Sequence, residues 1–113
     1  MPIRWDEAEE RACLFLKGEG YQIVVRNWRT KLGEVDIIAR DKDVLVFVEV
    51  KARTGDGFGG PEGAVDDRKQ RRLIFAALSF MQKTKCELPA RFDVVAIRPG
   101  SLLLYQDAFQ VPD

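Results

Sequence analysis

Apolar and polar residues alternate with two different periods along the chain, and these periods divide it into seven elements. Helical spacing of apolar residues predicts a helix, and alternation rich in β-branched residues predicts a strand. The predicted elements are a helix over 5–18, strands over 21–29, 34–40 and 44–53, a helix from Pro61 or Asp66 to about Thr84, and strands over 91–97 and 102–109. The order αβββαββ predicts an α/β fold with a mixed sheet and helices packed on it.

Charged residues interrupt the apolar alternation of the second and third predicted strands. A two-residue turn at 42–43 would join these strands in a hairpin in which Asp36 faces Glu49 and Glu34 faces Lys51. A four-residue loop keeps this register, whereas a three-residue loop without a bulge puts the two carboxylates on opposite faces. We therefore expect an even loop or a compensating bulge, with Asp36 and Glu49 on one face.

Two acids opposite each other in a sheet destabilise it. Their β carbons would lie about 4.5–5.5 Å apart, where like charges repel, and partial burial increases the cost. A shared proton, a cross-strand lysine or a divalent cation would each offset the repulsion. Carboxylate oxygens without cysteine or histidine suit Mg²⁺ or Mn²⁺ better than zinc. The residues by themselves leave all three solutions open.

The first predicted helix turns one of its acids toward the core. Its apolar arc is formed by Trp5, Ala8, Ala12, Phe15 and Leu16. Glu9 falls inside this arc, whereas Glu7 and Glu10 fall well outside it. A glutamate at the edge of such an arc can extend to solvent or pair with a basic residue, but glutamates are seldom buried without a partner. Glu9 is therefore a candidate functional residue.

The second predicted helix carries polar residues at the beginning of its inward face. That face runs through Leu73, Ala76, Ala77 and Phe80. One turn earlier it reaches Lys69 and Gln70, whereas Arg68, Arg71 and Arg72 point sideways or outward. The arginines alone would be explained as a solvated basic flank. Lys69 and Gln70 on the inward face indicate a site.

Length and charge limit the classes of protein that the chain can belong to. Its 113 residues, 46% hydrophobic and 32% charged, predict one domain over residues 1–113 with a buried core. The formal net charge is zero. A global basic field, which many nucleic-acid binders carry, is therefore absent, although a local basic patch is compatible with this balance.

The chemistry available to the chain is limited by the residues it lacks. It contains no histidine, which excludes Ser-His and Cys-His nucleophile systems and the usual zinc ligands. Cys13 and Cys86 are far apart in sequence, and we expect unpaired thiols in a reducing compartment. The first twenty residues are too charged for a signal peptide, and no apolar run approaches the length of a membrane span. We expect a cytoplasmic protein without a membrane segment.

Four stretches carry a resemblance to a known family. "GEVDIIA", "LVFVEVKAR", "FGGPEGAVDDRKQRRL" and "RFDVVAI", in this order and spacing, are similar to the YraN family of small bacterial proteins. That family is assigned to the PD-(D/E)xK nuclease superfamily, related to restriction endonucleases and archaeal Holliday-junction resolvases. The similarity covers Glu9 to Ile97 and implies a single-domain, restriction-endonuclease-like core. The superfamily's "PD" is "VD" here, and Ala8 replaces the glycine that typically precedes the helix-1 glutamate.

The resemblance also implies roles for individual residues. The positions that match the nuclease motifs as catalytic residues are Glu9, Asp36, Glu49, Lys51 and Gln70, the last either alone or together with Lys69. Asp36 and Glu49, with the backbone carbonyl near Val50, would hold Mg²⁺ or Mn²⁺. Glu9 would complete the shell directly or through water, or help to hold a second ion. Lys51 would orient or deprotonate the attacking water, or neutralise the phosphate.

DNA is the expected partner. Its backbone phosphates would be contacted by Arg53, Lys69, Arg71 and Arg72. The segment 54–60 would close over the strand being cut, with Phe58 either stacking on a base or packing into the fold. Resolvase relatives act as dimers, which gives a homodimer as a fold-level expectation.

The expected activity is a Mg²⁺- or Mn²⁺-dependent endodeoxyribonuclease selective for branched or single-stranded DNA, in DNA repair, recombination or processing. One alternative is a nucleic-acid-binding accessory module that keeps the nuclease fold and the metal site but cuts little alone. Another is a purely structural role, in which Glu34 pairs with Lys51 and Asp36 pairs with a basic neighbour in a buried ionic network.

Overall fold

The computed structural model describes residues 5–52 and 66–111 and confirms the predicted order of elements. The elements are α1 (Trp5–Gly18), β1 (Gln22–Arg29), β2 (Glu34–Asp41), β3 (Val44–Ala52), α3 (Asp67–Thr84), β4 (Ala90–Arg98) and β5 (Ser101–Phe109). The described part of α3 follows an N-cap at Asp66, whose side chain accepts a hydrogen bond from the Lys69 N–H. The alternative start at Pro61 lies outside the described residues. None of the described helices has the length and apolar character needed to cross a membrane.

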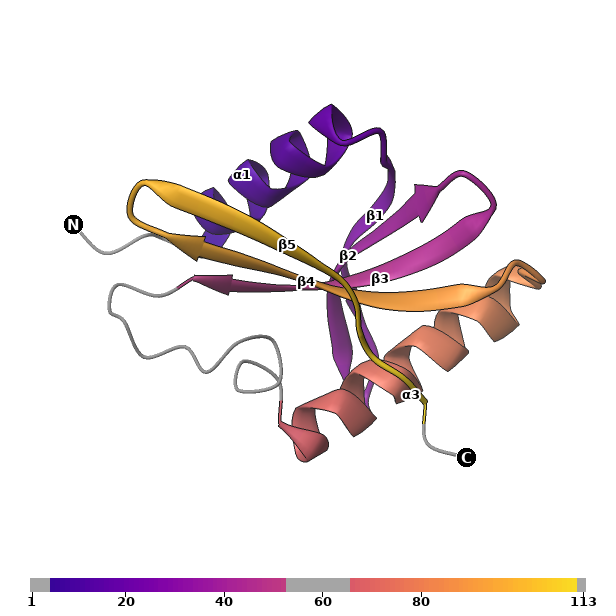
Figure 1. Ribbon diagram of the computed structural model, residues 1–113. Helices are drawn as coiled ribbons and strands as arrows, with labels where there is room; N and C mark the ends of the chain where they lie inside the picture. Colours follow the sequence, from indigo (N-terminus) through magenta and orange to yellow (C-terminus); the bar gives the residue numbers. More distant parts are fainter. Residues whose placement is uncertain (1–4, 53–65, 112–113) are drawn as a thin grey trace.

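The five strands form one mixed sheet with a helix on each face (Figure 1). The strands lie side by side in chain order, and all neighbours are antiparallel except β3 and β4. Parallel neighbours cannot be joined by a tight turn, and α3 lies in the connection between β3 and β4. The chain thus forms a single compact α/β domain.

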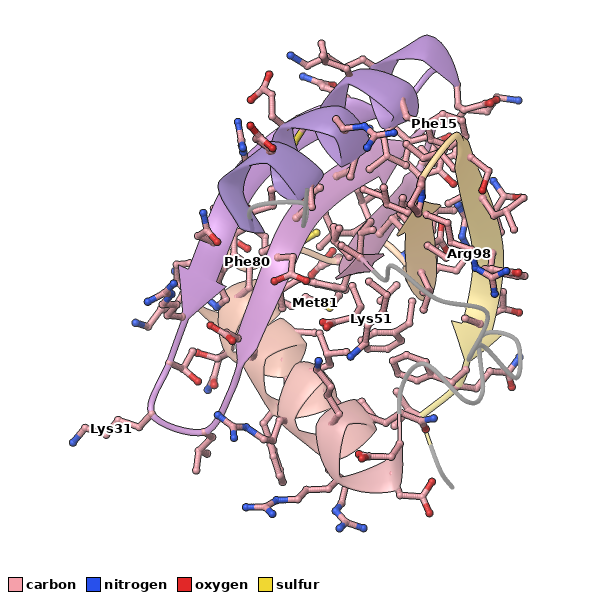
Figure 2. The ribbon with its side chains drawn as sticks, turned by 90° about the vertical axis from the view of Figure 1, so that its left-hand side faces the viewer. Phe15, Lys31, Lys51, Phe80, Met81 and Arg98 are labelled. Carbon is pink, nitrogen blue, oxygen red and sulfur yellow. The ribbon has the colours of Figure 1, made fainter. Side chains whose placement is uncertain are left out.

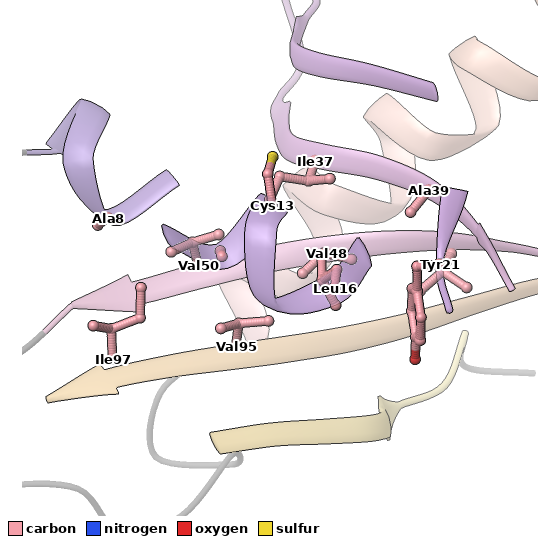
Figure 3. Packing of buried hydrophobic residues seen from close by; sticks show 12 residues of the cluster. Ala8, Cys13, Leu16, Tyr21, Ile37, Ala39, Val48, Val50, Val95 and Ile97 are labelled. Atoms are coloured by element: carbon pink, nitrogen blue, oxygen red, sulfur yellow. The ribbon is translucent and has the colours of Figure 1, made fainter. Parts of the chain in front are cut away.

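The face of the sheet that carries α1 is packed by small and β-branched side chains (Figure 3). Even-numbered positions of β3 point to this face, and their valines contact α1. The buried side chains here include Val46, Val48 and Val50 from β3 and Ala8, Ala12, Cys13 and Leu16 from α1. Because a strand alternates its faces, the odd-numbered positions of β3 point to the other helix.

The opposite face, which carries α3, is packed by aromatic residues. Phe47 of β3 and Trp28 of β1 both meet Phe80 of α3 edge to face, with ring centroids 6.2 and 5.3 Å apart. Leu73, in the second turn of α3, belongs to the same cluster. This packing fixes α3 against β3, on the side to which Glu49 and Lys51 also point.

Besides the register shift between Ile23 and Val25, a second irregularity interrupts the alternation of β1 and β2 at the same level. The paired residues on either side of it are Val25 with Ile38 and Trp28 with Val35. All four side chains pack on the α3 side, although the two residues in each strand are three positions apart. Asn27, between them in β1, has φ 57°. A local twist of this kind is typical of strands next to a site, and Asp36 lies at it.

Candidate active site

The β2–β3 hairpin brings the two expected acids to one place. Its turn has two residues, 42–43, and Ile37 pairs with Val48 in the predicted register. Asp36 and Glu49 are the next residue on each strand, and they are only 5% and 4% exposed. The predicted turn and register are therefore confirmed.

Asp36 lies at the point where the regular pairing of β2 with β3 ends. Its Oδ2 accepts a hydrogen bond of 2.8 Å from the backbone N–H of Val50. Burial raises the pKa of Asp36 from 3.8 to about 8, and the charge of Glu49 adds to the rise, whereas the Val50 hydrogen bond opposes it. At neutral pH and without a cation, the Asp36 carboxyl is therefore largely protonated.

Glu49 is neutralised by two lysines on the α3 side of the sheet. Its Oε1 lies 2.8 Å from Nζ of Lys69 and 3.9 Å from Nζ of Lys51. Figure 2 shows Lys51 on this side of the sheet, toward α3. Burial alone would lower the pKa of Lys69, but its hydrogen bond with Glu49 contributes to a net rise. The closer of the two lysines thus comes from the helix and not from the strand.

A pocket of about 250 Å³ lies over Glu49, between the sheet and the beginning of α3. Its lining residues are Glu34, Glu49, Asp66, Arg68, Lys69, Arg72 and Leu73. Arg68 and Arg72 are one helical turn apart and place two guanidinium groups at this pocket. The pocket combines buried carboxylate with exposed cationic side chains, an arrangement that can receive a phosphate group.

Glu9 approaches Asp36 from the other side of the sheet. It is only 2% exposed, as its place on the inner arc of α1 predicts. Its negative charge contributes to the raised pKa of Asp36, after the contributions of burial and Glu49. An acid from the α1 side and an acid from the α3 side therefore both raise the pKa of Asp36.

The remaining sequence candidates divide into three groups. Arg72 lines the pocket, whereas Arg71 is exposed and is not one of its described lining residues. Gln70 is half-buried in the first turn of α3, where its backbone N–H donates to the carbonyl of Asp66 at 2.8 Å. Arg53 and the segment 54–60, with Phe58, lie outside the described residues.

Glu34 does not take the partner that the hairpin register suggested. Its carboxylate lies 3.5 Å from the guanidinium of Arg29, its neighbour in β1. The expectation of a Glu34–Lys51 pair was therefore wrong, because β2 pairs with β1 at this level and its regular pairing with β3 has already ended. The alternative of a purely structural ionic network included this Glu34–Lys51 pair, so it loses one of its two ion pairs.

Comparison with known proteins identifies the family of this chain. Residues 8–97 match the model of a family described as "Uncharacterised protein family UPF0102". The chain belongs to this family. It is the YraN family that the sequence motifs resemble, so the predicted relationship is confirmed.

Individual UPF0102 proteins match over most of their length. A protein of Pseudomonas putida strain W619 is 50% identical over 93 residues, which cover 80% of this chain and 76% of the relative. One from Cupriavidus necator is 46% identical over 108 residues, covering 95% and 82%. One from Desulfosudis oleivorans is 47% identical over 106 residues, covering 91% and 86%. The names of these relatives state their membership of the UPF0102 family.

The donor set of this UPF0102 protein suits a hard divalent cation in its chemistry, since Asp36 and Glu49 offer buried carboxylate oxygens. Within residues 5–52 and 66–111, however, no group of three or more acids or cysteines is arranged to hold a metal ion. Asp36 and Glu49 would thus offer two ligands of a metal site. Further protein ligands require side chains to move or the backbone to contribute.

Sequence reasoning missed a second polar cluster, on the α1 side of the sheet. The buried Tyr21 hydroxyl donates to Asp93 Oδ2 at 2.7 Å and accepts hydrogen bonds from Arg91 at 2.7 Å and Gln106 at 2.8 Å. Arg91 also reaches Asp41 at 3.0 Å. The signal was the charged pair two positions apart in the apolar strand "RFDVVAI". These mutual hydrogen bonds indicate a structural clamp between strands.

Sequence reasoning also missed two residues of the pocket. The helical period predicts that Arg68 points sideways or outward, and it gives Asp66 only as a possible helix start, whereas both line the pocket. The spacing of Arg68 and Arg72, one turn apart on a flank of α3, was the available signal. It could not be used without knowing which flank faces Glu49.

Proposed function

We propose that this UPF0102 protein is a divalent-metal-dependent nuclease that hydrolyses phosphodiester bonds in branched or single-stranded DNA. The observation that supports this function is the meeting of two buried acids, Asp36 and Glu49, where β2 and β3 cease to pair. Lys51 and Lys69 lie beside them. Phosphodiester hydrolysis needs charge neutralised at the phosphate, an activated water and a stabilised leaving oxygen, and this set of side chains offers the necessary types of group.

In the proposed reaction Asp36 and Glu49 would hold Mg²⁺ or Mn²⁺, which supplies Lewis-acid chemistry at the phosphate. Glu9 and the backbone carbonyl near Val50 are the further ligands that we propose. Lys51, with its Nζ 3.9 Å from Glu49, would orient or deprotonate the attacking water, or neutralise the phosphate. The protein's own contribution is thus a fixed pair of acids and a cationic side chain beside them.

DNA would enter along the first turns of α3. Lys69, Arg68 and Arg72 line the same pocket as Glu49 and would contact backbone phosphates. Arg71, exposed on the same helix, would contact phosphates farther along the strand, and Arg53 keeps its proposed phosphate role. Because the net charge of the chain is zero, this local patch must supply the attraction that a basic protein spreads over its surface.

The nucleic-acid-binding accessory module is the second candidate, and two observations favour it. Glu49 is already neutralised by Lys69 at 2.8 Å, and the described residues include no ready-made group of three acids. Both features fit a fold that keeps the nuclease architecture and binds DNA without cutting it. The two functions differ in whether the protein alone cuts DNA.

Cleavage assays on branched, single-stranded and duplex DNA with Mg²⁺, Mn²⁺ or EDTA distinguish the candidates. The nuclease proposal expects metal-dependent cutting that disappears in Asp36→Ala and Glu49→Ala. Asp43→Ala is a matched control, because this acid lies in the turn of the same hairpin and its side chain is 93% exposed. Binding without cutting by the unaltered protein, unchanged in both site variants, supports the accessory module.

A further inference from the structure

The ammonium of Lys69 lies where Glu49 would meet a divalent cation. Glu49 has a side chain only 5% exposed, and its Oε1 is 2.8 Å from Nζ of Lys69. Lys51, at 3.9 Å from the same oxygen, is the more distant cation. A buried carboxylate needs a compensating charge, and in this structure α3 supplies that charge.

A metal ion and the Lys69 ammonium cannot both occupy the same side of this carboxylate. Mg²⁺ binds carboxylate oxygens at about 2.0–2.1 Å, and an ammonium held at hydrogen-bond distance from the same oxygen would face it as a like charge. Coordination through Oε1 of Glu49 on this side therefore requires Lys69 to leave. Lys51 has more room to remain, because it already lies farther away.

The Lys69 side chain can move away from Glu49 toward solvent. Its side chain is 42% exposed, compared with 16% for Lys51, so its head group can turn to solvent by rotating a flexible four-carbon stem. The pocket that it lines also holds Arg68 and Arg72. A released ammonium would join these two guanidinium groups as a third cation facing the pocket.

We propose that Lys69 is a built-in competitor for the metal site: it neutralises Glu49 in the metal-free protein, and cation binding releases it to the phosphate backbone of nucleic acid. The inference rests on the proposed function, because it places the cation and the phosphate in the same pocket. It goes beyond that function in giving the protein a coupling between its two ligands. By linkage, each ligand strengthens the binding of the other by the same factor.

The competition is tested by measuring Mn²⁺ affinity without nucleic acid, by titration calorimetry, in the full chain. Lys69→Met, which keeps the length of the side chain and removes its charge, is expected to bind Mn²⁺ about tenfold more tightly, a coupling of ordinary size. Lys69→Arg, which keeps the charge, is expected to show no such gain. Unchanged or weaker Mn²⁺ binding by Lys69→Met would overturn the proposal.

Arg72→Met separates direct competition from the general field of a nearby positive charge. Arg72 lines the same pocket but is exposed on α3. Its removal is expected to change Mn²⁺ affinity by less than about threefold, and raised salt should erase that change because exposed charges are screened. An equal gain in Arg72→Met and Lys69→Met would overturn the proposal. Circular dichroism of each variant establishes that it is folded; if Lys69→Met is not, Lys69→Gln takes its place with the same expectation.

The release of Lys69 to phosphate is tested with a fluorescently labelled single strand, whose anisotropy is followed in EDTA and in Ca²⁺, which takes the same kind of oxygen ligands. Ca²⁺ is expected to raise the DNA affinity of the unaltered protein by several-fold, about the size of an ordinary coupling. In Lys69→Met this metal effect should shrink to within about twofold. An undiminished metal effect would overturn the proposal.

Failure of the inference can be told from failure of the nuclease function. If the unaltered protein cuts DNA in a metal-dependent way but Lys69→Met binds Mn²⁺ no more tightly, the competition is overturned and the nuclease proposal is still supported. Tighter Mn²⁺ binding in that variant, with no cutting of any DNA, supports the competition and removes the nuclease. Absence of Mn²⁺ binding in both proteins overturns the competition, and the cleavage assay then decides the nuclease proposal separately.

Discussion

Gly33, before the first residue of β2, lies directly against the backbone carbonyl of Arg72 in α3. A β carbon added at Gly33 would lie 2.0 Å from that oxygen, well inside van der Waals contact. The obstacle is helix backbone, which cannot turn aside as a side chain can. The absence of a side chain at Gly33 therefore sets how closely the helix that carries Lys69 and Arg72 approaches the sheet.

Gly33→Ala is expected to push this turn and α3 apart. The cost should be about 1–3 kcal/mol in the free energy of unfolding, as for other over-packed sites, measured by urea denaturation. Gly18→Ala is the matched control, since a β carbon there meets nothing within 4 Å and alanine is favoured in a helix. Equal stability of Gly33→Ala and the unaltered protein would show that the helix moves freely at this contact.

Asp36→Asn is expected to remove a pH dependence from the metal-free protein. The pKa of Asp36 is raised from 3.8 to about 8 when the chain folds, so between these values the folded state binds more protons than the unfolded state. The stability contributed by the protonated carboxyl is complete below the unfolded pKa and is lost as pH rises to about 8. The loss can reach about 1.4 kcal/mol for each pH unit.

The measurement for Asp36→Asn is urea unfolding in EDTA across this pH range, taken as the difference between variant and unaltered protein. Groups common to both cancel, and the asparagine oxygen can still accept the Val50 hydrogen bond. The variant should equal or exceed the unaltered protein in stability near pH 8. A large loss of stability at every pH would instead indicate that the Asp36 charge is paired in a structural network.

The strand alternation was enough to predict that Asp36 and Glu49 come together. It fixed the register of the hairpin, and the register places Asp36 beside Glu49. The helical period likewise placed Glu9 toward the sheet, where it is 2% exposed. These predictions succeeded because burying one face of a strand or helix allows only one register or rotation.

The partners of the acids could not be predicted in the same way. Lys69 reaches Glu49 along a flexible side chain from another element, and periodicity places α carbons without specifying how such a side chain extends. Glu34 lies against Arg29, its partner in β1, and Asn27 two residues before Arg29 has φ 57°. Asparagine adopts positive φ more readily than most residues, but the sequence does not show where the chain uses this freedom.

Tyr21→Phe is expected to weaken the polar cluster on the α1 side of the sheet without changing Asp36 or Glu49. The change removes one hydroxyl that donates to Asp93 and accepts from Arg91 and Gln106, and should cost about 1–3 kcal/mol in the free energy of unfolding. Burial raises the pKa of Tyr21 from 10 to about 12, so the unaltered protein should also lose stability between these pH values. Tyr105→Phe, outside this network, serves as the control in both measurements.

Arg68 and Arg72 are expected to contribute to nucleic-acid binding through phosphates alone. Each phosphate contact releases condensed counterions, so Arg68→Gln or Arg72→Gln should lower the slope of log affinity against log salt by roughly 0.7 for a single strand. Lys17→Gln, in the last turn of α1 on the other side of the sheet, removes the same charge far from the pocket and should leave the slope unchanged. Fluorescence anisotropy in EDTA at several salt concentrations measures all three. Equal losses in the three variants would mean that net charge, and not the pocket beside Glu49, attracts the strand.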